Sequence, residues 1–269
     1  NDPAACPYVI SVGATNKKAV TSFSSVGPTW DGRTFPEITA PGYDILSLNS
    51  IVGEMYKTSK LLDRVYHQDG YFGYIMASGT SMSCPMTAGM TALVKQQYPE
   101  INPFAMRVAL IKGAHPIDGY YPRSIEKAQG AGLINLTATL SYIEANKVES
   151  NPNKIATISY NKLPYDTKTL IQKPGDEQTY NYTFISGYAG TFTVETSGID
   201  MFDVQLSKTS FVLEKPGIDF LSVKVKVPFD ISEGAYQGLI TIKEGSTIID
   251  SIEVKITIAN PVASVYFDT

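Results

Sequence analysis

The chain has 269 residues, of which 43% are hydrophobic and 18% charged, a composition typical of one large or two ordinary folded domains. Twenty-two basic residues against 26 acidic ones give a formal net charge of −4, which excludes the basic surface of a nucleic-acid-binding protein. The longest apolar runs are a few residues, far short of the roughly 20 of a membrane-spanning helix, so no membrane span is expected. The N-terminus lacks Met, a basic region and an apolar run, which predicts that the chain starts within a longer protein.

The first half of the chain mixes strand and helix patterns. Apolar and β-branched runs predict strands over 8–13 and 45–48. Apolar residues at helical spacing predict three helices, over 81–98, 104–112 and 135–147. Asn102 followed by Pro103 is typical of an N-cap and first helical residue. Strands followed by helices predict an α/β fold.

The second half alternates polar and apolar residues almost continuously, which is typical of strands. A polar, Pro-containing stretch at 148–154 indicates a linker, so we predict a boundary near residue 152 and two domains, 1–152 and 153–269. Seven strands are expected, over 155–160, 179–185, 191–195, 202–206, 220–227, 238–243 and 248–258. They predict an all-β sandwich, fibronectin-III-like or jelly-roll, with a hairpin turn at 244–246.

Ser81 lies in the most informative stretch, Ser78-Gly79-Thr80-Ser81-Met82-Ser83-Cys84-Pro85. A hydroxyl that opens a helix, with Pro85 in the first turn, lies at the positive end of the helix dipole beside backbone N–H groups without helical partners. Acyl transfer needs such a nucleophile and such donors, because negative charge develops on the former carbonyl oxygen. On this stretch alone, an ordinary serine N-cap is the alternative.

The stretch resembles the nucleophile segment of the subtilisin-like serine proteases, whose signature is Gly-Thr-Ser-Met-x-x-Pro. Four further segments resemble that family and occur in its order. Three of them precede Ser81, at 8–14, 23–28 and 40–42, and one comes after it, at 130–135. The resemblance implies the C-terminal portion of a subtilisin-like parallel-sheet domain. It also implies a secreted or cell-surface enzyme that hydrolyses proteins or peptides. Ser81 would be the nucleophile and an oxyanion donor, and the substrate would bind along Ala77, Ser78, Gly79, Thr80 and Met82.

The partners that such a serine needs are not visible in the sequence. The family's Asp-Ser/Thr-Gly and His-Gly-Thr segments do not occur, and its Gly-Asn turn would lie just before residue 1. His67 is better explained as a loop residue, and His115 as a surface or helix C-terminal residue. We therefore expect an N-terminal part of the same peptidase, carrying Asp, His and Asn, to bind this chain. A non-catalytic subtilase-like scaffold or binding protein is the alternative.

A cation site and two cysteines complete the expectations. The family resemblance implies a weak site, suited to calcium, with carbonyls from Ala4, Cys6 and Val9 and a carboxylate from Asp31. An exposed loop aspartate is the alternative reading of Asp31. Cys84 is expected to be a small buried hydrophobe of the helix.

Two Asn-x-Thr glycosylation acceptor patterns occur in the sequence. They begin at Asn135 and Asn181 and matter only in a glycosylating secretory route.

Overall fold

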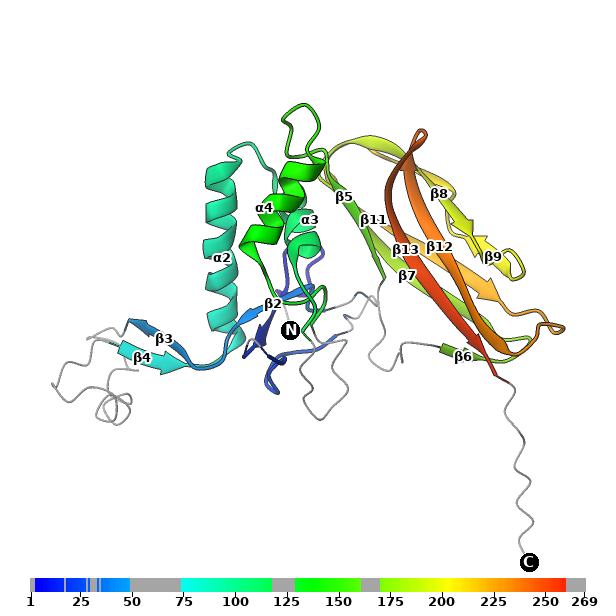
Figure 1. Cartoon of the computed structure of the whole chain (residues 1–269), viewed down its shortest axis with the longest axis horizontal. Helices are drawn as coiled ribbons and strands as arrows, with labels where there is room; N and C mark the ends of the chain where they lie inside the picture. The colour runs from blue at the N-terminus through cyan, green and yellow to red at the C-terminus, as the bar shows by residue number, and fades with distance from the viewer. Residues whose placement is uncertain are drawn as a thin grey trace, which may run out of the picture. The chain divides into compact units, whose positions relative to one another are not determined.

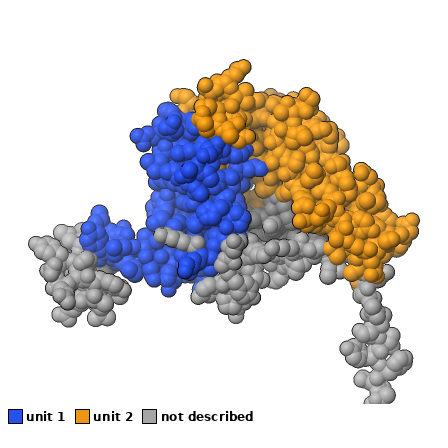
Figure 2. All heavy atoms as spheres, viewed as in Figure 1, with its two compact units in different colours: residues 1–26, 35–99, 110–142 blue, residues 27–34, 100–109, 143–269 orange. Residues whose placement is uncertain are grey.

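A computed structural model describes residues 3–16, 18–27, 29, 33, 35–48, 74–117, 129–160 and 170–259. The chain divides into two compact units, drawn in different colours in Figure 2. Unit 1 comprises residues 1–26, 35–99 and 110–142, and unit 2 comprises residues 27–34, 100–109 and 143–269. The predicted domain boundary near residue 152 stays a prediction.

Unit 1 is built on a parallel strand pair. Strands β1 (Val12–Thr15) and β2 (Ile38–Pro41) pair in parallel, and Leu133 continues the arrangement with a parallel bridge to Thr39. An antiparallel ribbon of β3 (Ile45–Leu48) and β4 (Tyr74–Ala77) follows (Figure 1). β3 has the predicted bounds, whereas β2 and β4, of four residues each, were not predicted.

The strand predicted over 8–13 begins four residues later than expected. Tyr8 is 72% exposed, and the backbone N–H of Val9 donates to the carbonyl of Cys6 in a turn. The prediction and β1 share only Val12 and Gly13, because turns between Pro3 and Val9 take up the first predicted residues and the strand continues to Thr15.

Three helices lie within one residue of their predicted bounds. They are α2 (Thr80–Gln97), α3 (Pro103–Gly113) and α4 (Leu136–Asn146). Asn102 caps α3 as predicted, because its Oδ1 accepts from the backbone N–H groups of Phe104 and Ala105, at 3.0 Å each. Asn135 caps α4 in the same way, through the N–H of Ala138 at 3.1 Å.

Unit 2 contains two sheets. The first has the order β10-β8-β12-β13-β6 and the second the order β5-β7-β11-β9. Their strands are β5 (Ala156–Tyr160), β6 (Leu170–Gln172), β7 (Glu177–Ser186), β8 (Gly190–Ser197), β9 (Asp203–Leu206), β10 (Ser210–Leu213), β11 (Gly217–Lys226), β12 (Gly234–Glu244) and β13 (Thr247–Ile258). Seven were predicted and the short β6 and β10 were not. The predicted hairpin is confirmed, since Glu244 pairs with Thr247 across Gly245 and Ser246.

Both sheets of unit 2 contribute side chains to one hydrophobic core. Phe184 of β7 packs against Phe192 of β8 and Phe211 of β10, with ring centroids 4.8 and 5.2 Å apart. Between the sheets, Asp250 of β13 accepts hydrogen bonds from the hydroxyl of Thr157 at 2.8 Å and the N–H of Ile158 at 3.0 Å. Helices followed by a β-rich region are thus confirmed, while the fibronectin-III-like or jelly-roll assignment stays a prediction.

Candidate active site

Ser81 is the second residue of α2 and its side chain is exposed. The residue before the helix, Gly79, provides no side-chain cap, so no side chain of the described residues occupies the N–H groups of the first turn. These N–H groups and the helix dipole favour negative charge at the position of Ser81. The site therefore combines an accessible hydroxyl with donors suited to an oxyanion.

Pro85 lies in the second turn of α2, not in the first as predicted. A proline has no N–H, so the carbonyl of Ser81, four residues earlier, lacks its helical hydrogen bond.

Several contacts hold the start of α2 in place. The N–H of Gly79 donates to the carbonyl of Gly42 at 2.8 Å. The Ser78 hydroxyl accepts from the N–H of Asp44 at 2.8 Å and donates to the Asp44 carboxylate at 3.2 Å. The buried Ser83 hydroxyl donates to the carbonyl of Ala40 at 3.0 Å. Ser78, predicted to bind substrate, is thus engaged with Asp44 and holds the segment that leads into Ser81.

Gly42 is needed for this arrangement. A Cβ at this position would lie 2.2 Å from the Ser83 hydroxyl and 2.8 Å from the Gly79 carbonyl. In the sequence, Gly42 was recognised as part of a segment that resembles the family, whereas nothing indicated a role for Asp44. The φ of Asp44 is 50°, which is unusual for a residue with a side chain.

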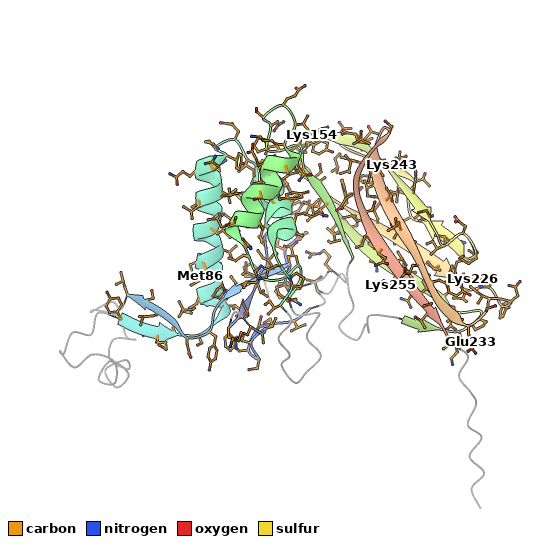
Figure 3. The ribbon with its side chains drawn as sticks, in the orientation of Figure 1. Met86, Lys154, Lys226, Glu233, Lys243 and Lys255 are labelled. Carbon is orange, nitrogen blue, oxygen red and sulfur yellow. The ribbon has the colours of Figure 1, made fainter. Side chains whose placement is uncertain are left out.

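One face of α2 is buried and the opposite face is exposed. Ser83, Thr87, Met90 and Val94 are the buried residues, and the helix packs with them against β1 and β2. Beyond Ser81 the exposed face carries small and apolar residues, namely Pro85, Ala88, Gly89, Ala92 and Leu93, and it ends at the polar Lys95 and Gln96. Met86, labelled in Figure 3, is 39% exposed. The prediction that Cys84 is buried is wrong for the described residues, since it too lies exposed.

The structure describes only some of the other residues singled out in the sequence. His115 is exposed, its backbone pairs with that of Leu133, and no hydrogen bond within the described residues joins it to Ser81. His67 lies outside the described residues, as does Asp31 of the predicted cation site. Where the structure describes the chain, no group of three or more His, Cys, Asp or Glu side chains could hold a metal.

Comparison with known proteins decides the family. The model of the subtilase family matches residues 1–168, which include the whole segment around Ser81. The chain belongs to the subtilase family. The resemblance expected from the signature is therefore confirmed.

Curated relatives of this subtilase chain come from bacteria and plants. It is 34% identical over 144 residues to the serine protease AprX of Bacillus subtilis (strain 168), covering 49% of this chain and 30% of AprX. It is 36% identical over 118 residues to SBT4.14 and 32% identical over 195 residues to SBT4.7, two subtilisin-like proteases of Arabidopsis thaliana. These matches cover 43% and 65% of this chain. The chain spans between 15% and 30% of the length of these three relatives.

A solved structure also matches most of this subtilase chain. Fervidolysin from Fervidobacterium pennivorans, described as a keratinolytic enzyme related to subtilisin, is 17% identical with a TM-score of 0.42. The match covers 95% of this chain and 35% of fervidolysin.

Among the described residues of this chain, no helix is both long and apolar enough to span a membrane.

Proposed function

We propose that this chain is the C-terminal portion of a secreted serine endopeptidase that cleaves peptide bonds through an acyl-enzyme on Ser81. The observation that carries the proposal is the exposed hydroxyl of Ser81 at the uncapped start of α2, in a family of proteases. The catalytic Asp, the His and a second oxyanion donor, an Asn, would come from an N-terminal segment outside these 269 residues.

The chemistry follows from this arrangement. With a histidine to take its proton, the Ser81 Oγ attacks the scissile carbonyl, and negative charge passes to the carbonyl oxygen. The N–H of Ser81 donates to that oxygen, and the dipole of α2 stabilises the charge. The intermediate then collapses, the amine leaves with the proton from histidine, and water releases the acyl group. Ala77, Ser78, Gly79, Thr80 and Met82 would line the substrate on either side of Ser81.

The surface of α2 supports a bound N-terminal segment. Across its 18 residues, Lys95 is the single charged side chain, and the 15 residues before it, 80–94, are apolar or small on every side. A helix of this kind is normally buried all round. Here the described residues bury one face and leave Pro85, Ala88 and Ala92 exposed. We infer that the missing segment of the peptidase packs on this exposed face, which places its histidine beside Ser81.

Two further elements belong to the proposal. Residues 153–269 would form the β-sandwich accessory domain, since the two sheets share one core. Calcium would bind the carbonyls of Ala4, Cys6 and Val9 with Asp31. Carbonyl oxygens suit a hard cation, and Asp31 must supply the charge because the three described residues offer none.

The decisive experiment uses a fluorophosphonate probe, which labels activated serines. The protein is prepared with its N-terminal segment, and the labelled residue is located by peptide mass spectrometry. Labelling at Ser81 is expected, and Ser81→Ala should abolish it and lower proteolysis by about 10⁶-fold. The control Ser25→Ala removes another exposed hydroxyl and should change neither readout. Absence of label on the wild-type protein would favour the alternative, a non-catalytic subtilase-like scaffold or binding protein.

A second variant tests the contact of α2 with the missing segment. Ala92→Arg places a charge at the centre of the exposed face and should leave the folding of this chain unchanged, because arginine is a good helix former. It should nevertheless weaken the binding of the N-terminal segment by at least about 100-fold, because a buried, unpaired charge is costly. Isothermal titration of the two separately prepared parts measures this.

The matched control is Gln97→Arg on the same helix. Gln97 is also exposed, but it lies about 140° around the helix axis from Ala92. It should bind the segment with nearly wild-type affinity. Equal affinities for the Ala92→Arg and wild-type chains would show that this face of α2 does not carry the contact.

A further inference from the structure

Unit 2 contains a pocket of about 370 Å³ on its four-stranded sheet. Its lining comes from β7, β11 and the chain that follows β9, and consists of Asn181, Tyr182, Ser207, Lys208, Phe220, Leu221 and Ser222. This volume lies at the lower end of the range of small-molecule sites. Nothing in the proteolytic mechanism uses the pocket.

A row of small polar side chains crosses three strands at the pocket. Asn181 of β7 is paired in register with Ser222 of β11. Ser207 follows β9, and its N–H donates to the Ser222 carbonyl while its hydroxyl accepts from the Ser222 N–H, both at 2.9 Å. The neighbours Tyr180, Tyr182, Leu221 and Val223 belong to the core, so by strand alternation Asn181 and Ser222 lie on the opposite, outer face.

Asn181 is free to bind a ligand. Its side chain is exposed, and its amide forms no hydrogen bond within the described residues. An amide offers both a donor and an acceptor, and the Ser222 hydroxyl beside it offers the same pair of functions. A ligand rich in hydroxyl groups matches this set.

Phe220 adds an apolar surface to the polar row. It lies two residues from Ser222 on the same face of β11 and is 46% exposed, whereas the adjacent Leu221 is 4% exposed. An exposed aromatic ring beside hydrogen-bonding groups suits a ligand that has one apolar face and a polar rim.

The pocket carries no unbalanced charge. The Lys208 ammonium lies 2.8 and 3.0 Å from the two carboxylate oxygens of Asp219. Because this pair is neutral as a whole, the lysine is a poor site for a phosphate, a sulfate or an acidic sugar. The ligand is therefore expected to be neutral.

We propose that this pocket binds a pyranose ring of a neutral glycan. The C–H groups on one face of the sugar would stack on Phe220, and its hydroxyls would bond to Asn181 and Ser222. Two sources supply this chemistry, a free polysaccharide and a glycan attached to Asn181 itself, which begins the pattern Asn181-Tyr182-Thr183.

The first arm of the test addresses a free polysaccharide. The full chain, produced without glycosylation, is run in native gels that contain mixed-linkage β-glucan, xyloglucan, galactomannan or the acidic polygalacturonate. Retardation by at least one neutral polymer is expected, and not by polygalacturonate. Phe220→Ala should weaken this binding about tenfold or more. The control Phe229→Ala removes a phenylalanine that is 82% exposed and does not line the pocket, and should bind like the wild type.

The second arm addresses a glycan on Asn181. The chain is secreted from yeast with Thr137→Ala, which removes the other acceptor pattern without changing the capping residue Asn135. Enzymatic removal of the glycan should lower the melting temperature of this chain by a few degrees, and much less when Phe220→Ala is added. Success in either arm supports the proposal and identifies the source. The proposal is overturned if no neutral polymer retards the chain and glycan removal affects both yeast variants equally.

Discussion

Replacing Phe184 by alanine is expected to lower the free energy of unfolding by about 4 kcal/mol, at the level of the costliest core truncations. The side chain is fully buried and packs against both Phe192 and Phe211, whose rings also stack on each other, so its removal leaves a cavity in the core shared by the two sheets. Urea denaturation of the full chain, followed by circular dichroism, measures the loss.

The control for this prediction is Phe229→Ala, which removes the same side chain from an exposed position. It should change the free energy of unfolding by no more than about 0.5 kcal/mol. Similar losses for the two variants would mean that the shared core of unit 2 is not the main source of its stability.

Gly132→Ala is expected to be as severe, for a different reason. The φ of Gly132 is 117°, and a Cβ there would lie 2.0 Å from the carbonyl oxygen of His115. That carbonyl accepts from the N–H of Leu133 at 2.8 Å, so it cannot move without breaking the bridge. We expect a loss of about 3 kcal/mol or more, measured as a fall in the melting temperature of unit 1.

The control variant Gly245→Ala distinguishes the cost of a positive φ from the cost of the steric clash expected at Gly132. Gly245 also has a positive φ, of 59°, but no atom lies within 4 Å of its expected Cβ. This variant should cost only about 1 kcal/mol, the usual penalty of the left-handed conformation. If Gly132→Ala were no worse than Gly245→Ala, the close approach to His115 would not be a constraint.

Local signals in the sequence predicted the helices well. Asn102 was predicted to cap α3, and Asn135, predicted as the first residue of α4, caps that helix instead; a cap acts within a few residues of where it stands. Some strands of three or four residues were missed, among them β4 and β10, because so short a stretch carries little alternation, although β3 and β9 are equally short and were predicted. The start of β1 was misplaced because the turn before it contains apolar residues.

Long-range contacts could not be predicted in this way. The Asn102 side chain caps α3 and also donates to the carbonyl of Gly187, 85 residues away, at 2.7 Å. The backbone N–H of the same residue donates to Asn153 at 2.8 Å. Asn102 thus ties α3 to the start of the β-rich region. Its first role is visible in the sequence, and the other two depend on tertiary structure.

The candidate site likewise has one feature that was predictable from the local sequence and one that depends on tertiary structure. Ser81 was predicted from its signature, and the structure puts its hydroxyl in the open at the start of α2. The contact of Ser78 with Asp44 was not predicted, because it joins residues 34 apart across the β3–β4 ribbon. Its role in holding the nucleophile segment follows from geometry alone.

Gly79 before α2 has a consequence for the evolution of stability in this protein. Its backbone is extended, with φ 162°, and the nearest atoms to an added Cβ lie 3.6 and 3.7 Å away, so a serine or aspartate would fit. Such a residue would cap the helix and add roughly a few tenths of a kcal/mol of stability relative to glycine. Its oxygen, however, would occupy an N–H group of the first turn that an oxyanion at Ser81 would use. The glycine thus leaves the first turn without a cap, and a capping side chain there would compete with the proposed reaction at Ser81, so stabilising substitutions are better sought elsewhere in the chain.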